Sequence, residues 1–350
     1  MNANPNRAVR VYCVDLAKRK FQVHGYTDAG ACVYRRTLSR EAFEKLFRQV
    51  SGTEALVVME ACASAHHFGR QFLARDLKVK LVPPQFVAKL RHGNKTDGND
   101  ADAIYAVHRD PRVRPVPVKS VQQQDLCAYH RVRELLVKQR TQLINQARGL
   151  LAERGLVAAR GHEGFAELLR AVAGHTHSEV TEPLGDLMRL IAAQIQGIEA
   201  QIDAVERRLR EALKSSELAR RLDRATGVGC ITATAVVGTF GERVERFADA
   251  RQFAASLGVT PRENSSGETR RLGGITKRGD PYLRKLLVQC AQSIVNACQR
   301  RDDAICQFAR RLLDRRPRNT VVIAVANRLA RIIYAMIKHG TDYQPAHASN

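Results

Sequence analysis

AVRVYCVDLAKRKFQVHGYTDAGACVYRRTL, residues 8–38, contains three apolar segments divided by short polar ones. The segments AVRVYCVDLA, KFQVHGYT and CVYRRTL follow one another at the spacing of β-hairpins. Segments of this kind form strands whose side chains alternate between the two faces of a sheet. The stretch therefore predicts three consecutive antiparallel strands, with Asp15 near the end of the first.

The residues that follow alternate between helical and strand patterns. REAFEKLFRQV has helical periodicity, ALVVME is a buried-strand run ending in Glu60, SAHHFGRQFLARDL is helix-like, and KVKLVPP is a fifth strand closed by prolines. This order predicts a ribonuclease H-like α/β domain over residues 1–120, because a doubly wound parallel sheet would lack the opening hairpins.

The charge of the chain is large and unevenly distributed. Its 350 residues include 57 Lys or Arg and 35 Asp or Glu, a net charge of +22. Residues 1–120 carry +10, residues 121–215 carry +1 and residues 216–350 carry +11. Two basic blocks around a nearly neutral middle predict that both ends contact a polyanion. Charge alone also fits a generic basic protein, such as a ribosome-associated factor.

Cysteine usage and hydropathy indicate the compartment. The eight cysteines are scattered without a CxxC pair, which favours reduced thiols over a disulfide framework or a zinc site. MNANPNRAVR lacks the apolar stretch of a secretory signal, and no apolar run approaches the ~20 residues of a membrane span. We therefore expect a cytoplasmic protein without a membrane partner.

The middle block, residues 121–215, follows a Pro-rich linker and has helical periodicity. Four heptads carry apolar residues at both seam positions: Met188, Ile195, Ile202 and Leu209 at one, and Ile191, Ile198, Val205 and Ala212 at the other. An earlier helix repeats Leu136, Leu143 and Leu150. These repeats predict a coiled-coil oligomerisation region, in which the two helices pair as an antiparallel hairpin, across a dimer, or both.

The third block, residues 216–340, is helical, and residues 341–350 are predicted to form a disordered tail. Its TGVG turn, with Gly227 and Gly229, matches a helix–hairpin–helix element that can offer backbone N–H groups to a DNA phosphate. The motif by itself is weak, since it also occurs in proteins that do not bind DNA.

Four carboxylates occupy positions that a fold can bring together. Asp15 and Glu60 each end a strand, so both project from one sheet edge if those strands are neighbours. Asp97 and Asp100 share one face of a helix, whereas Asp102 points elsewhere. As alternatives, Asp15 caps a turn, and the acids of TDGNDADA favour a helix N-terminus.

Convergent carboxylates repel one another unless cations neutralise them. Hard oxygen ligands in this number suit one or two Mg²⁺ ions, with Mn²⁺ as a possible substitute. Two such ions would clamp the attacking and leaving oxygens of a phosphoryl transfer. The excess of aspartate in residues 94–110 of so basic a chain is explained if the cluster holds metal, which then binds phosphate.

Several segments resemble a known family. VDLAKRKF, VVMEACASAHHFGR and NKTDGNDADAIYAV resemble the three parts of the DEDD, RuvC-like domain of IS110-family transposases. TGVGCITATAVV and FADARQFAASLGVTPRENSSGETRRLGGITKRGDPYLRKLL resemble the C-terminal transposase domain of that family. The likeness runs from about residue 8 to 340, and NDADAI and ITKRGDPYLR resemble the IS1111 branch.

The resemblance implies a recombinase with two catalytic groups. The family's metal-binding carboxylates correspond to Asp15, Glu60, Asp97 and Asp100, which would hold Mg²⁺. The family's serine nucleophile corresponds to Ser266, next to Gly267, with Ser265 in reserve. By analogy Ser266 would attack a DNA phosphate, form a covalent 5′-phosphoserine link and release a 3′-hydroxyl that later attacks the exchanged strand.

The resemblance also implies partners. Family members are guided by a structured bridge RNA that pairs with donor and target DNA. They act as homo-oligomers, dimers or tetramers, in which the serine of one subunit meets the carboxylates of another. Transposition of this kind takes place at the nucleoid of a prokaryotic cell.

The residues around Ser266 are basic and rich in glycine. The candidate nucleic-acid-binding cations are Arg262, Arg270, Arg271, Lys277, Arg278, Arg284 and Lys285. Such a loop can bind DNA and stabilise charge on a pentavalent phosphate. No histidine lies near Ser266 in the sequence, so a His-dependent serine hydrolase is poorly supported. As alternatives, Ser266 is an ordinary turn serine and the cations form a solvated face.

Three functions therefore compete. The first is the RNA-guided recombinase with a serine and a metal site. The second, a RuvC-like metal-dependent junction-resolving endonuclease, leaves the SSG loop unexplained. The third, a non-catalytic nucleic-acid-binding protein with a decayed metal site, predicts loss of carboxylates, and all four are present. The first function accounts for both basic blocks and for the helices between them.

Overall fold

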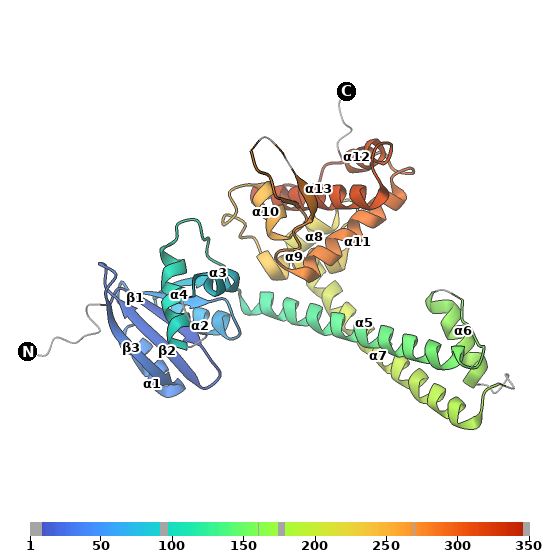
Figure 1. Ribbon diagram of the computed structural model, residues 1–350, viewed down its shortest axis with the longest axis horizontal. Helices are drawn as coiled ribbons and strands as arrows, with labels where there is room; N and C mark the ends of the chain where they lie inside the picture. The colour runs from blue at the N-terminus through green and yellow to red at the C-terminus, as the bar shows by residue number, and fades with distance from the viewer. Residues whose placement is uncertain are drawn as a thin grey trace, which may run out of the picture. The chain divides into compact units, whose positions relative to one another are not determined.

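The computed structural model describes residues 9–91, 97–159, 161–173, 179–267, 269 and 271–345. The chain forms two compact units (Figure 1). The first unit contains residues 1–121 and 243–252, and the second contains residues 122–242 and 253–350.

The first unit is built on a five-stranded sheet. Its strands are β1 (Val11–Leu16), β2 (Lys20–Tyr26), β3 (Cys32–Ser39), β4 (Leu56–Glu60) and β5 (Lys78–Val82). Their order is β3-β2-β1-β4-β5. β2 pairs antiparallel with both β1 and β3, whereas β4 runs parallel to β1 and to β5. The predicted succession of three antiparallel strands, helix, strand, helix and strand is confirmed.

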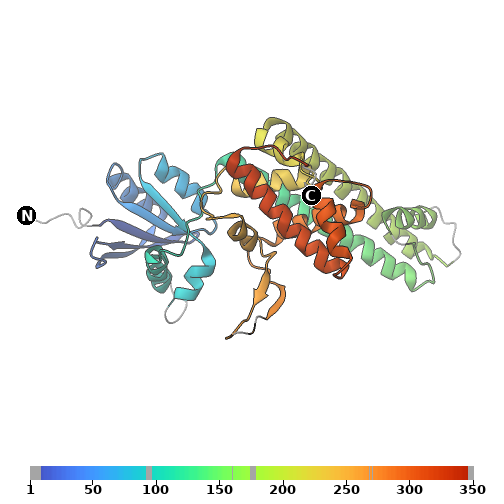
Figure 2. The same cartoon turned by 90° about the horizontal axis from the view of Figure 1, so that it is seen from above.

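Helices cover both faces of this sheet (Figure 2). They are α1 (Arg40–Gln49), α2 (Ala65–Leu73), α3 (Pro84–Leu90) and α4 (Asp97–Arg109). One core contains Tyr12 and Val14 of β1 together with phenylalanines of α1 and α2. The other contains Cys13 of β1 and the apolar residues Ile104 and Val107 of α4. Burial on both faces explains why the central strands read as continuous apolar runs.

Two long helices of the second unit form a hairpin. The helices of this part are α5 (Val121–Ala152), α6 (His162–Ala173) and α7 (Glu182–Ser215). Arg133 of α5 lies 2.7 Å from Glu206 of α7, and Arg140 lies 3.8 Å from Glu199. A step of seven residues forward in α5 thus matches seven residues backward in α7. Of the arrangements that the sequence left open, the structure shows the antiparallel hairpin within one chain.

The heptad pattern of α7 has a direct structural correlate. Met188, Ile195, Ile202 and Leu209, which share one seam position, are all buried. The second seam set, three residues later in each heptad, is only partly buried. One apolar stripe of α7 is therefore buried against other parts of the same chain, as expected for a helix that packs along its length.

The rest of the second unit is mainly helical. Its elements, of which the first residues of α10 belong to the first unit, are α8 (Glu217–Asp223), α9 (Cys230–Phe240), α10 (Ala250–Ser256), β6 (Pro261–Glu263), β7 (Leu272–Ile275), α11 (Pro281–Ala297), α12 (Ala304–Leu313) and α13 (Arg318–His339). β6 and β7 pair antiparallel. This hairpin occupies the segment for which the sequence indicated only a polar loop.

α13 is the helix that bears on the expectation of no membrane span. By length and composition α13 could cross a membrane, the one helix to meet that test within the part of the chain that the structure describes. More than half of its most apolar stretch is buried inside the protein. Buried residues such as Val325, Leu329 and Ile333 give α13 the character of a core helix. Core burial accounts for its apolar composition without a membrane.

Candidate functional site

Asp15 and Glu60 occupy neighbouring positions at one edge of the sheet. β1 and β4 are parallel, with Val14 opposite Met59, so the next residue of each strand is one of the two acids. Val14 and Met59 face the core under α1 and α2. Since side chains alternate along a strand, Asp15 and Glu60 lie on the opposite face, which α4 covers. Both acids are partly buried.

Cys62 reports the negative charge at this edge. Burial, then the charge of Glu60 and then the charge of Asp15 together raise the pKa of its thiol to about 11. One thiol thus senses both carboxylates, in agreement with the strand register. Negative potential of this kind attracts cations.

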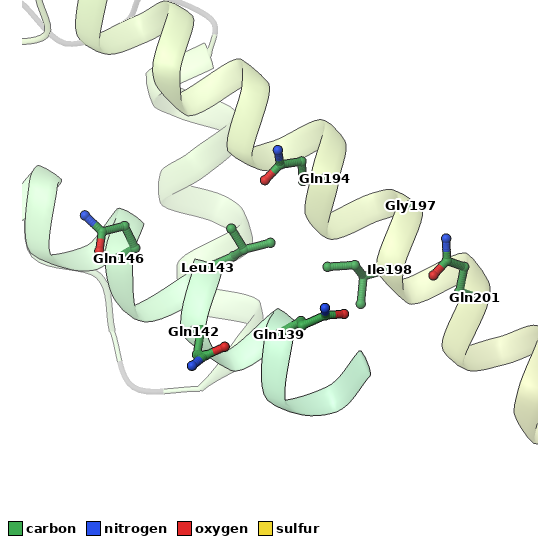
Figure 3. Close-up of a pocket in the computed structure, with 8 residues that line it drawn as sticks. All are labelled: Gln139, Gln142, Leu143, Gln146, Gln194, Gly197, Ile198 and Gln201. Atoms are coloured by element: carbon green, nitrogen blue, oxygen red, sulfur yellow. The ribbon is translucent and has the colours of Figure 1, made fainter. Parts of the chain in front are cut away.

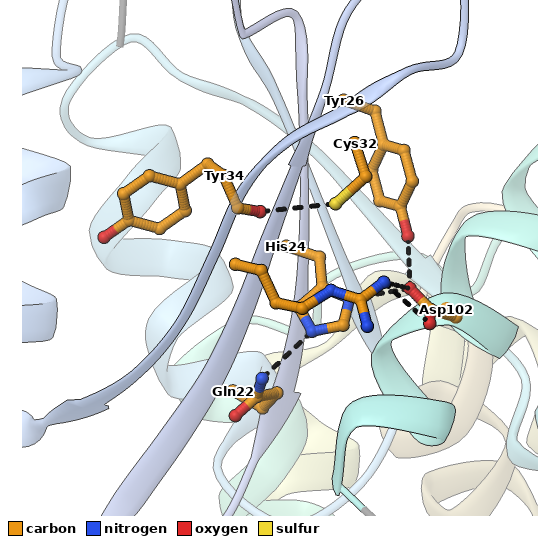
Figure 4. Close-up of polar contacts among 7 residues, drawn as sticks. Gln22, His24, Tyr26, Cys32, Tyr34 and Asp102 are labelled. Carbon is orange, nitrogen blue, oxygen red and sulfur yellow. Dashed lines mark hydrogen bonds and ion pairs between the residues drawn. The ribbon is translucent and has the colours of Figure 1, made fainter. Parts of the chain in front are cut away.

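Asp102 fastens α4 to the sheet (Figure 4). Its Oδ1 accepts a hydrogen bond from His24 Nδ1 at 2.7 Å and from the Tyr26 hydroxyl at 2.6 Å. Arg35 Nη2 lies 3.1 Å from Oδ2. Burial opposes ionisation of Asp102, but the hydrogen bonds from Tyr26 and His24 hold its pKa below the ordinary value. Asp102 thus contacts β2 and β3 and not the ends of β1 and β4, in agreement with the expectation that it points away from the other acids.

The contacts of α4 define its direction across the sheet. Asp102 meets His24, which pairs with the third residue of β1. Tyr105 stacks on Tyr26, at a ring-centroid distance of 3.7 Å, and Tyr26 pairs with the first residue of β1. α4 therefore runs opposite to β1, and its N-terminal end is directed toward the edge at which β1 and β4 end. Lys80 of β5 donates to the carbonyl of His108 at 3.0 Å and holds the other end of α4.

The two acids predicted on α4 differ in what the structure describes. Asp97 is the first residue of α4, and its side chain lies outside the described part. Asp100 accepts a hydrogen bond from Arg91 Nη1 at 3.0 Å. The two side chains are only 14% and 20% exposed, so a largely buried guanidinium neutralises Asp100. Arg91, at the end of α3, was not singled out from the sequence.

These residues fit a divalent cation by chemistry. Asp15, Glu60 and Asp100 offer the hard carboxylate oxygens that Mg²⁺ prefers. Among the residues whose side chains are described, no three His, Cys, Asp or Glu side chains form a cluster that could hold a metal ion. A metal centre at this place would need the carboxylate of Asp97 as a further ligand. The ion pair between Arg91 and Asp100 would have to open for Asp100 to bind the cation.

Ser265 and Ser266 lie between β6 and β7 in the second unit. Ser265 Oγ donates to Glu263 at 3.0 Å and accepts from the Arg271 amide at 3.2 Å. Ser266 is exposed, and its carbonyl accepts from the Thr269 amide at 3.2 Å. Of the two candidate serines, Ser265 is thus the one whose hydroxyl helps to hold the loop.

The predicted nucleic-acid-binding cations fall into two groups. Arg262, Arg271, Lys277 and Arg278 are on or beside the β6–β7 hairpin, and Arg270 lies outside the described residues. Arg284 Nη1 instead donates to the carbonyls of Leu257 and Arg278, at 3.3 and 3.0 Å. Lys285 lies 3.6 Å from Glu134. Arg284 therefore ties α11 to the residues before it, a contact that sequence spacing does not reveal.

The TGVG turn is tightly packed. Gly227 has φ +79°, and a Cβ at this position would lie 2.5 Å from Cγ1 of Ile294. The Thr226 hydroxyl donates to Asp303 at 2.8 Å, and Gly229 is the N-cap of α9. Gly227 is therefore required by packing and by its backbone conformation.

A pocket of about 660 Å³ lies between α5 and α7 (Figure 3). Five glutamines line it together with Leu143, Gly197 and Ile198. None of the predicted catalytic residues contributes to its lining. The described part of this pocket therefore offers amide groups and apolar surface, and no acid or nucleophile.

Comparisons with known proteins agree with this arrangement. The family described as "Transposase IS116/IS110/IS902 family" matches residues 219–307, which include most of α8 and the whole of α9, the β6–β7 hairpin and α11. The DEDD transposase family of the IS110 type, described as "Transposase", matches residues 13–154, which include Asp15, Glu60 and α4. The two matches therefore cover both candidate site regions.

Full-length relatives extend the likeness over nearly the whole chain. A "Probable family 20 transposase" of Pseudomonas aeruginosa is 41% identical over 333 residues, 95% of this chain and 98% of the relative. The "Transposase for insertion sequence element IS1111A" of Coxiella burnetii is 33% identical over 336 residues, 96% and 92% of the two chains. The "Transposase for insertion sequence element IS1328" of Yersinia enterocolitica is 33% identical over 330 residues, which cover 94% of this chain and 97% of the relative. The chain therefore belongs to the IS110/IS1111 family of transposases.

Proposed function

We propose that this transposase cuts and rejoins DNA with two catalytic groups, a divalent-metal site on the first unit and a serine on the second. The observation that carries the proposal is the neighbouring position of Asp15 and Glu60 at the ends of β1 and β4, on the face that α4 covers. The strand order β3-β2-β1-β4-β5 supports a ribonuclease H-like, RuvC-like domain.

The metal site would be formed by Asp15, Glu60, Asp97 and Asp100. The direction of α4 supports this, because it brings the helix start toward the edge that carries Asp15 and Glu60. A divalent cation, Mg²⁺ or Mn²⁺, would supply charge neutralisation to the phosphate oxygens. Arg91 pairs with Asp100, so this ion pair would have to open for Asp100 to hold the cation.

The covalent step uses Ser266. Its Oγ attacks the phosphorus of a DNA phosphodiester and loses a proton to solvent or a nearby base. An Oγ–P bond forms, the P–O3′ bond breaks, and the leaving 3′-oxygen takes up a proton. In rejoining, a 3′-hydroxyl attacks the phosphoserine, the P–Oγ bond breaks, and Ser266 recovers its proton. Each step replaces one phosphoester bond with another, so no external energy source is required.

The remaining features support nucleic-acid partners and assembly. The cations of the β6–β7 hairpin and the Gly227–Gly229 turn, a helix–hairpin–helix element, would bind phosphates of DNA. A bridge RNA would choose the DNA sites. The α5–α7 hairpin would join subunits as a coiled coil in a dimer or tetramer, so that Ser266 of one subunit meets the carboxylates of another. The assembly would act in the prokaryotic cytoplasm at the nucleoid.

A covalent-trapping assay tests this function. Full-length protein is mixed with Mg²⁺, the RNA transcribed beside its gene and labelled element-junction DNA, and the mixture is separated on a denaturing gel. We expect a protein–DNA adduct that Ser266→Ala and Asp97→Ala both abolish. Ser265→Ala is the matched control, and it should retain the adduct at a lower rate because Ser265 only holds the loop.

Two results would contradict the proposal. An adduct that forms with Ser266→Ala but not with Ser265→Ala would identify Ser265 as the nucleophile. Cleaved DNA without any adduct, insensitive to both serine variants and abolished by Asp97→Ala, would identify a RuvC-like junction-resolving endonuclease instead.

A further inference from the structure

Two arginines of α8 and its C-cap residue, Arg224, line a small pocket in the second unit. The pocket has a volume of about 180 Å³ and is lined by Glu217, Arg220, Arg221, Arg224, Gly340 and Asp342. Three guanidinium groups and two carboxylates therefore meet in one place. The acids come from the start of α8 and from the segment that follows α13.

Asp342 is the anion at the centre of this cluster. Its Oδ2 accepts from Arg224 Nη1 at 3.0 Å, and its Oδ1 lies 3.7 Å from Arg221 Nε. Arg221 Nη2 also donates to Glu217 at 2.6 Å. The Arg221 side chain is only 20% exposed, against 64% for Arg224. A guanidinium withdrawn this far from water needs an anionic partner.

The geometry of the contact matches a phosphodiester. Each oxygen of the Asp342 carboxylate faces a different arginine, as the two non-bridging oxygens of a phosphodiester would. Guanidinium forks are the groups that proteins use most for such paired oxygens. Without Asp342 the lining would contain three cations against Glu217 alone, a charge that a phosphate would balance better than a neutral ligand.

Tyr343, the neighbour of Asp342 in the chain, contacts Thr226 of the TGVG turn. Burial raises the pKa of Tyr343, while a hydrogen bond with the Thr226 side chain lowers it in part. Thr226 begins the turn that contains Gly227 and precedes α9. The segment Asp342–Tyr343 therefore lies against both α8 and the turn that is proposed to contact DNA.

We propose that the pocket of Arg220, Arg221 and Arg224 binds a phosphodiester group of DNA or RNA, and that Asp342 is an internal competitor which the nucleic acid displaces. The C-terminal segment then lowers the affinity of the protein for nucleic acid until a strand of sufficient length occupies the pocket. The inference rests on the proposed function only in taking the polyanion to be nucleic acid.

Equilibrium binding of the full-length protein tests this pocket. Fluorescence anisotropy is measured with labelled duplex DNA and, separately, labelled single-stranded RNA, in EDTA over a series of KCl concentrations. We expect Asp342→Asn to tighten binding about threefold to tenfold, since one repulsive charge and one competitor are removed. Arg224→Gln should weaken binding by a similar factor and reduce the salt slope by about 1. The nucleic acid that shows these effects is the ligand of the pocket.

A matched pair on α7 controls for long-range charge. Glu211 accepts from Arg208 at 3.0 Å, and both side chains are exposed. Glu211→Gln changes the net charge as Asp342→Asn does and should tighten binding less. In the Arg224→Gln background the gain from Asp342→Asn should shrink, because the two residues act on one site.

Three outcomes would overturn the inference. Equal effects of Asp342→Asn and Glu211→Gln would leave only general electrostatics. If the salt slope of Arg224→Gln equals that of wild type, Arg224 does not contact a phosphate of the nucleic acid, and the pocket is not a phosphate site. A lower melting temperature in Asp342→Asn without tighter binding would make the contact a structural anchor. In each of these cases the proposed function still holds if the wild-type protein binds DNA or RNA. If the wild-type protein binds neither, both the proposed function and this inference are wrong.

Discussion

His24 Nδ1 lies 2.7 Å from Oδ1 of Asp102, a contact between residues 78 positions apart that joins β2 to α4. Gln22 Nε2 lies 2.9 Å from His24 Nε2 and can only donate. A carboxylate can only accept, so His24 is neutral with its proton on Nδ1. Burial lowers the pKa of His24, which favours this neutral form. The helix that carries two of the four candidate metal ligands is thus held by a fifth acid.

We expect Asp102→Ala to loosen α4. The change leaves the His24 and Tyr26 donors without their acceptor, at a cost of about 2–3 kcal/mol in the free energy of unfolding. Hydrogen exchange of the α4 amides should rise. His24→Asn keeps a donor near the Nδ1 position and should protect α4 better than His24→Leu. Equal exchange in all these variants would mean that the apolar residues of α4 hold it without the polar contact.

Removal of Arg91 should make the thermal stability of the first unit depend more strongly on divalent cations. Arg91→Gln removes the guanidinium that neutralises Asp100. We expect a lower melting temperature in EDTA and a larger rise on addition of Mg²⁺ than in wild type, because the cation replaces the lost positive charge. Lys78→Gln, whose lysine pairs with exposed Glu54, is the control. A rise no larger than in the control would argue against Asp100 as a metal ligand.

Two glycine substitutions should act in opposite directions. Gly227→Ala places a Cβ 2.5 Å from Ile294 at a positive φ, which should destabilise the protein by about 2–4 kcal/mol. Gly197→Ala lies inside α7 with no atom within 4 Å of the new Cβ, so it should stabilise by about 0.5–1 kcal/mol. Urea unfolding of the full chain measures both. A mild effect of Gly227→Ala would show that the TGVG turn can shift.

His130 should make the second unit sensitive to acid. Burial and then Arg133 lower its pKa to about 4, and it lies 3.1 Å from Thr234 and 3.0 Å from Tyr282. The unfolded state binds the proton at higher pH than the folded state. The contribution of neutral His130 to stability is therefore full above about pH 6.5 and falls by about 1 kcal/mol per pH unit toward pH 4.

The measurement is urea unfolding of the full chain across this pH range. His130→Gln should flatten the decline while lowering stability at neutral pH, because a hydrogen-bonding amide replaces the titrating ring. His67→Gln, a change at an exposed histidine, should leave the decline as it is. An identical pH slope in His130→Gln and wild type would assign the acid sensitivity to other groups.

Much of the fold follows from local pattern. The hairpin spacing of residues 8–38 and the strand runs that end in Asp15 and Glu60 predicted the succession of strands and helices, because alternation and turn length are properties of neighbouring residues. The heptad of α7 likewise predicted its buried stripe. Where the pattern was ambiguous the expectation was incomplete: the β6–β7 hairpin read as a loop, and α13 did not stand out as a long apolar helix.

The sequence by itself determined which residues end the central strands, which acids begin α4 and which serines lie in the basic loop. Only the tertiary structure decided that Asp102 binds His24, that Arg91 neutralises Asp100 and that Asp342 enters the α8 pocket. The physical reason is the range of the interactions. Periodicity and turn chemistry act within a few residues, whereas a partly buried charge takes the partner that distant elements bring within about 3 Å.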